Sequence, residues 1–98
     1  MTLDDIVQDI HVLEQDLQTY ERKYGVLSET FYESYLKGEE PADHAWVMDW
    51  SMWAGAYEIW LRRHAQYQAA IQKLQKQMPI LATIIGKTAR RESILVPA

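Results

Sequence analysis

The 98-residue sequence contains no cysteine, which excludes disulfides, cysteine-ligated zinc and thiol catalysis. It has only three prolines and four glycines. Because these residues form turns and end helices, their scarcity favours long helices over many short strands. No uncharged apolar run approaches the ~18 residues that a membrane span requires, and the start "MTLDDIVQDI" is acidic where a signal peptide is basic. The sequence therefore predicts a cytoplasmic protein with no membrane segment.

The remaining composition is that of an ordinary small globular domain, with 48% hydrophobic and 24% charged residues. Its formal net charge of −4 is unevenly distributed, because residues 1–49 hold 12 acids and 3 bases whereas residues 50–98 hold 2 acids and 7 bases. Two halves that fold against each other would partly cancel these charges. An acidic surface that docks on a basic protein is the alternative.

The first half of the chain predicts two helices. Thr2 is a typical N-cap with acids in the following turn, and apolar residues recur every three or four positions until Gly25, which predicts a helix over residues 3–24. Ser28 is the predicted N-cap of a second helix of about ten residues, which Gly38 ends. The loop "EEPAD" follows, and Asp43 is the next predicted N-cap.

The stretch from His44 to Met78 predicts a third and dominant helix with a heptad stripe that begins in "WVMDWSMW". At 1.5 Å per residue this helix would be ~52 Å long against ~33 Å for the first, so one antiparallel partner cannot cover it. We expect the stripe to form a core or dimer seam, because rings of a ligand cage or stacking platform lie among cations, and Asp49 and Glu58 are close to these rings. The predicted seam comprises Trp46, Trp50, Trp53, Tyr57, Trp60, His64, Tyr67, Ile71 and Leu74.

These patterns predict an all-α fold: a hairpin of two long helices with a short crossing helix and a coiled-coil-like seam, able to dimerise. The helical domain would cover residues 1–79. A tail over residues 80–98 would be irregular or form short strands, although a short helix or a segment that orders on a partner also fits its two apolar runs around "KTARR". The candidate partner-binding residues of this tail are Ile80, Leu81, Ile84, Ile85, Lys87, Arg90, Arg91, Ile94, Leu95 and Val96.

Residues suited to catalysis or metal binding do not form a recognisable motif. His11, His44 and His64 are far apart in the chain, and none has metal-ligand spacing to another histidine. There is no glycine-rich phosphate loop and no HExxH motif. We therefore expect no catalytic residues, no metal and no cofactor, and a protein that is not an enzyme.

Over roughly 40 residues, the middle of the chain carries the pattern Y-G-x-x-S-x-x-F-x-x-x-x-x-x-G, followed by an acidic loop and a W-x-x-x-Y-E stretch. This pattern resembles the signature of small cyanobacterial and archaeal proteins that act as antitoxin-like partners of small toxins. The extra tryptophans and the apolar tail of this chain lie outside it. The resemblance implies a toxin-neutralising protein whose toxin is typically a ribonuclease. Its matching positions are Tyr24, Gly25, Ser28, Phe31, Gly38, Glu39, Trp53, Tyr57 and Glu58.

Three functions remain open from the sequence. The first is an antitoxin-like protein that binds a cognate toxin and forms a homo-oligomer. The second is a nucleic-acid-binding regulator, which would include autoregulation at its own promoter DNA. Its phosphate contacts would come from Arg62, Arg63, Lys73, Lys76, Lys87, Arg90 and Arg91. The third is a coiled-coil structural adaptor.

Overall fold

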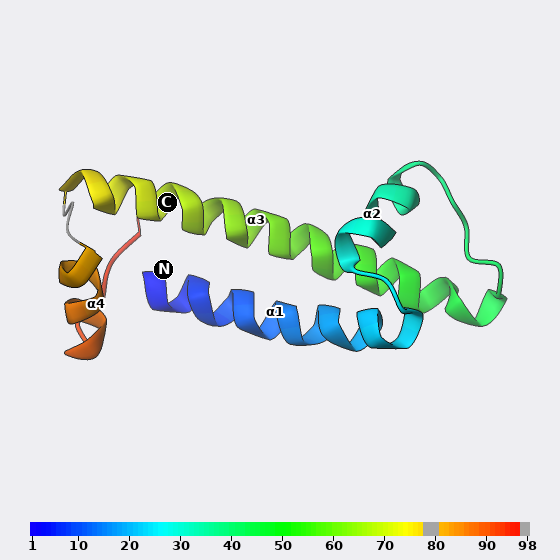
Figure 1. Ribbon diagram of the computed structural model, residues 1–98, viewed down its shortest axis with the longest axis horizontal. Helices are drawn as coiled ribbons and strands as arrows, with labels where there is room; N and C mark the ends of the chain where they lie inside the picture. Colours follow the sequence, from blue (N-terminus) through cyan, green and yellow to red (C-terminus); the bar gives the residue numbers. More distant parts are fainter. Residues whose placement is uncertain (78–80, 97–98) are drawn as a thin grey trace. The chain divides into compact units, whose positions relative to one another are not determined.

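The computed structural model describes residues 1–77 and 81–96, and these residues confirm the all-α prediction. The described elements are α1 (Leu3–Tyr24), α2 (Ser28–Leu36), the 3₁₀ turn η1 (His44–Trp46), α3 (Val47–Gln77) and α4 (Leu81–Ala89). Their contacts divide the chain into two compact units. Unit 1 combines residues 1–11 with residues 62–98, and unit 2 spans residues 12–61. Within each unit a part of α3 packs against a part of α1 (Figure 1).

Helix α1 begins and ends where the sequence predicts. The Thr2 Oγ1 accepts a hydrogen bond from the Asp5 amide at 3.2 Å, and the Asp5 carboxylate accepts one from the Thr2 amide at 2.9 Å. This reciprocal pair satisfies two amides at the helix start. At the other end Gly25 has a φ of +80°, a left-handed conformation that glycine adopts without steric cost.

Helix α2 departs from the prediction at its first residue. Ser28 is not the N-cap: that position is Leu27, which makes no side-chain capping bond, and Ser28 is the first residue of the helix. Its hydroxyl instead donates to the Glu21 carboxylate of α1, so a tertiary partner has replaced the local cap. The C-terminus of α2 is as predicted, because Gly38 has a φ of +89° and the amide of Glu39 bonds to the carbonyl of Ser34, which completes a Schellman motif.

Helix α3 follows the predicted cap with one difference. Asp43 caps the segment through a 2.9 Å bond from the Ala45 amide to its carboxylate. The first three residues form the 3₁₀ turn η1, and the α-helix proper starts at Val47, since a tighter first turn is a common way to satisfy the amides at a helix start. The predicted end at Met78 lies outside the described residues.

Unit 1 corrects the expectation of an irregular or short-strand tail. Residues 81–89 form α4, because Leu81, Ile84, Ile85 and Thr88 recur at helical spacing, although Ile84, Ile85 and Thr88 are β-branched. Beyond α4 the chain returns to its own start. There the Leu3 amide bonds to the Ile94 carbonyl at 2.8 Å, and Thr2 and Leu95 form an isolated antiparallel bridge.

The core of unit 1 joins α1, α3 and α4 with the returning segment. One cluster of buried side chains comprises Leu3, Ala70, Ile84 and Ile94, and Ile6 of α1 is also fully buried. Tyr67, Ile71, Leu74 and Val96 pack against this cluster and are partly buried. No helix among residues 1–77 and 81–96 has the length and apolarity needed to cross a membrane.

The C-terminus of α4 carries a strained residue. Arg91 has a φ of +59° in the described chain, and its amide and that of Glu92 close a Schellman motif onto Thr88 and Lys87. Glycine usually occupies this position, because a Cβ in the left-handed region costs about 1 kcal/mol.

We therefore predict that Arg91→Gly stabilises the protein by about 1 kcal/mol relative to Arg91→Ala. Both variants remove the same charge, so the backbone strain of alanine is compared with the larger entropy that glycine loses on folding. Urea denaturation followed by circular dichroism measures the difference. Equal or lower stability of the glycine variant would contradict the prediction that strain at residue 91 is the larger of the two effects.

Candidate functional site

A stack of aromatic rings around Trp53 organises unit 2. Trp53 is fully buried, and the Phe31 ring lies 3.8 Å from it at an interplanar angle of 4°. Tyr20 and Tyr24 of α1 stack on the same indole at 5.8 and 5.6 Å. Each such pair contributes about 0.5–1.5 kcal/mol beyond the burial of its area. One tryptophan of α3 thus holds both α1 and α2 in place.

The indole N–H of Trp53 is also fixed by a hydrogen bond. Its indole N–H donates to the Ser28 hydroxyl at 2.9 Å. That hydroxyl donates to the Glu21 carboxylate at 2.7 Å, and the Ser28 amide donates to the same carboxylate oxygen at 2.8 Å. We call this chain of bonds from Trp53 through Ser28 to Glu21 the serine lock. It ties α3 to the start of α2 and to the last turn of α1.

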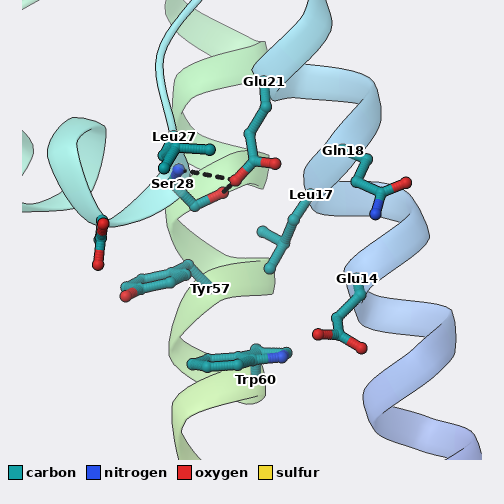
Figure 2. Close-up of a pocket in the computed structure, with 9 residues that line it drawn as sticks. Glu14, Leu17, Gln18, Glu21, Leu27, Ser28, Tyr57 and Trp60 are labelled. Atoms are coloured by element: carbon teal, nitrogen blue, oxygen red, sulfur yellow. Dashed lines mark hydrogen bonds between the residues drawn. The ribbon is translucent and has the colours of Figure 1, made fainter.

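A cavity of about 290 Å³ lies beside the serine lock. Helix α1 supplies one wall, α3 supplies two aromatic rings, and Leu27 and Ser28 lie at the end next to Glu21 (Figure 2). We call it the acidic aromatic cavity. Its lining residues are Glu14, Leu17, Gln18, Glu21, Leu27, Ser28, Glu29, Tyr57 and Trp60.

The two rings of the cavity stack on each other, since Tyr57 and Trp60 lie 5.7 Å apart at an interplanar angle of 9° (Figure 2). Burial raises the pKa of the Tyr57 hydroxyl, and the negative charges of Glu29 and Glu21 raise it further. The carboxylates of α1 and α2 act together on this side of α3, where they favour positive charge.

A second polar network lies elsewhere in unit 2. The Asp49 carboxylate accepts hydrogen bonds from the Lys23 ammonium at 2.6 Å and from the Tyr24 hydroxyl at 2.7 Å. The bond from Lys23 is the main reason that the pKa of Asp49 lies below its usual value of 3.8, and Tyr24 lowers it further. The same pair raises the pKa of Lys23, whereas burial is the main cause that raises the pKa of Tyr24.

The predicted seam is divided between the two units. In unit 2, Trp53 is buried, Trp50, Tyr57 and Trp60 are partly buried, and Trp46 is 37% exposed with its edge against Tyr24. Helices α1 and α2 of the same chain cover these rings. The other predicted members, His64, Tyr67, Ile71 and Leu74, lie in unit 1 and are partly buried. The core interpretation therefore holds for Trp53, whereas dimerisation stays a prediction.

The predicted partner-binding residues lie in unit 1, but the structure does not present them as one surface. Ile84 and Ile94 are buried at 5% and 8% exposure, so their side chains serve the core of unit 1. Leu81, Ile85 and Leu95 are exposed at 59%, 57% and 77%. The remaining described members are Lys87 and Val96, which are half-buried, and Arg90 and Arg91, which are exposed. Ile80 lies outside the described residues.

Comparison with known proteins adds no relative. No protein-family model, curated protein sequence or solved structure matches this chain. The site must therefore be interpreted from its own chemistry. Among the described residues no group of three or more histidine, aspartate or glutamate side chains could hold a metal ion.

The sequence-based prediction missed the acidic aromatic cavity. Glu14 and Glu21 are seven residues apart in α1, with Leu17 between them, so they share a face with a core residue. That spacing was a usable signal. The approach of Glu29 was not predictable, because it depends on how α2 crosses the other helices.

The serine lock predicts that removing a single hydroxyl group lowers the free energy of unfolding by a large amount. We expect Ser28→Ala to destabilise the protein by about 2–3 kcal/mol, because the buried N–H of Trp53 and the Glu21 carboxylate lose a shared partner. Helix propensity alone would give the opposite sign, since alanine is the better helix former. Urea denaturation followed by tryptophan emission measures the change. Ser51→Ala on the exposed face of α3 is the matched control, and equal effects would contradict the lock.

The network around Asp49 predicts a specific pH dependence. Because its folded pKa is lowered, the carboxylate adds stability that is fully present above its unfolded value of 3.8 and is lost as pH falls through the folded pKa. We expect Lys23→Met to move the Asp49 pKa up toward 3.8 and to reduce the loss of stability between about pH 5 and pH 3. Carboxyl NMR titration measures the pKa. Lys37→Met is the control, and an unchanged Asp49 pKa in Lys23→Met would contradict the assignment.

Proposed function

We propose that this chain binds and neutralises a small basic protein, as an antitoxin binds its toxin. The observation that carries the proposal is the division of charge between the two units. Unit 2 holds ten acids and three bases, a formal charge of −7, whereas unit 1 holds four acids and seven bases, a formal charge of +3. A surface of one dominant sign speeds encounter with partners of opposite charge and repels others.

Unit 2 also exposes apolar side chains that suit a protein partner. Met48, Met52 and Ile59 are 72%, 57% and 40% exposed, and their spacing places them on one face of α3. Gly55 lies on the same face, where an added Cβ would meet nothing within 4 Å. Methionine side chains adapt to differently shaped surfaces. An apolar stripe in an acidic unit supports contact with a basic protein more than with nucleic acid, whose phosphates the acids would repel.

A nucleic-acid-binding role is the second candidate, and the positive charge of unit 1 favours it. Lys73 and Lys76 are exposed one turn apart on α3, at positions suited to phosphate contacts. Two other cations of unit 1 already pair with acids, because Arg63 contacts Asp9 at 3.3 Å and Arg90 contacts Glu92 at 3.2 Å. The acidic unit 2 makes this the weaker candidate.

The test is co-expression of the tagged chain with the product of the adjacent gene. We expect the neighbour to be toxic when expressed alone, to be harmless when both are present, and to co-purify with the tagged chain. Reversing two exposed acids of unit 2, Glu39→Lys with Glu40→Lys, should weaken the complex roughly ten-fold at low salt, mainly through slower association. Surface plasmon resonance measures that change.

The matched control neutralises unit 1 instead. Lys73→Ala with Lys76→Ala should leave the protein complex intact if unit 2 is the contact surface. A neighbour that is neither toxic nor bound refutes the proposal. Binding to promoter DNA that falls steeply with salt and is lost in the lysine variant would establish the second candidate.

A further inference from the structure

We propose that the acidic aromatic cavity binds the cationic end of a side chain, an arginine guanidinium in preference to a lysine ammonium, on the partner protein. The inference deepens the proposed function and rests on it for the source of the cation. Three independent features of the cavity converge on this chemistry: its size, its stacked rings and its carboxylates.

The size of the cavity suits a single side chain. Its volume of about 290 Å³ lies at the lower end of the range of ligand pockets. It lies wholly within unit 2, the acidic unit, and its lining comes from α1, α3 and the start of α2. A long, flexible side chain on a docked protein could fill it, and its apolar stem would lie against Leu17 and Leu27.

The stacked rings favour a planar cation. Tyr57 and Trp60 lie at an interplanar angle of 9°, and tryptophan gives the strongest attraction for a cation placed over its face. A guanidinium group is flat and weakly hydrated, so it stacks on such rings at a lower desolvation cost than an ammonium group. The aromatic wall therefore favours arginine over lysine.

The carboxylates supply the opposite charge. Glu21 comes from α1 and Glu29 comes from α2, and none of the described residues that line the cavity is a lysine or an arginine. One oxygen of Glu21 is already occupied by the two bonds from Ser28. Glu29 is exposed at the first turn of α2, where its charge can meet an incoming cation. An organic cation is favoured over a metal ion, because no three histidine, aspartate or glutamate side chains among the described residues are grouped so that they could hold a metal ion.

The experiment titrates the intact protein with N-acetyl-arginine amide and follows the indole N–H signals by ¹H–¹⁵N NMR. Trp60→Phe identifies the signal of Trp60. We expect that signal to shift and saturate with a dissociation constant of about 10 mM, the strength of one screened ion pair with one cation–π contact. N-acetyl-citrulline amide, which has the same shape without the charge, should cause no saturable shift.

Two variants on the same helix provide the matched comparison. Glu29→Gln should weaken arginine amide binding roughly five-fold, because it removes one carboxylate of the cavity. Glu33→Gln removes an equal charge one turn further along α2, from an exposed residue that does not line the cavity, and should leave the affinity unchanged. Equal responses to arginine and citrulline amides, or equal losses in the two variants, overturn the proposal.

A second arm identifies the source of the cation. If the cavity takes a partner side chain, Glu29→Gln weakens the complex with the neighbouring gene product more than Glu33→Gln does, and free arginine amide competes with that complex. If arginine amide binds but neither variant changes the protein complex, the cavity serves a small free cation and the protein-partner inference is wrong. If arginine amide fails to bind while the complex forms, the inference fails and the proposed function stands.

Discussion

The hydrogen bond from the Trp53 indole to the Ser28 hydroxyl is the interaction on which unit 2 depends. It is fully buried, so its loss would leave a donor without solvent to replace the partner. The same hydroxyl reaches the Glu21 carboxylate, and the ring of Trp53 carries the stacked contacts of Phe31, Tyr20 and Tyr24. Three helices therefore meet at one side chain. A small unit with one phenylalanine gains from this arrangement both apolar burial and a fixed orientation of its helices.

The sequence predicts the helices well because their signals are local. Thr2, Gly25, Gly38 and Asp43 each act through hydrogen bonds or backbone angles within a few residues, and all four behave as expected. The prediction that Ser28 is the N-cap of α2 is wrong because the signal there is not only local. Its hydroxyl could cap α2 locally or bond to a distant carboxylate, and the choice depends on where α1 places Glu21. The acidic aromatic cavity also forms only when the helices pack. The one part of it that the sequence indicates is that Glu14 and Glu21 lie on the same face of α1.

Charge and packing are linked in unit 2. Ten acids on a unit of 50 residues repel one another and lower the stability of the compact state. Some of that repulsion is relieved within the unit, because Asp49 pairs with Lys23 and the Tyr32 hydroxyl donates to Glu58 at 3.1 Å. No lysine or arginine lines the acidic aromatic cavity beside Glu21 and Glu29. A basic partner would bring positive charge to these two carboxylates, so that binding would relieve part of the repulsion.

Glu21 connects that event to the stability of the fold. Its carboxylate holds Ser28, and it also lines the acidic aromatic cavity. A cation in the cavity would lie beside a carboxylate that the two bonds from Ser28 hold in place in the folded state. Any ligand that prefers the folded state raises its stability by mass action. Occupation of the cavity would therefore strengthen the serine lock, and weakening of the lock would in turn lower affinity for the cation. The stability of the aromatic core of unit 2 and the affinity of its acidic surface for a cation are then coupled, because both depend on Glu21.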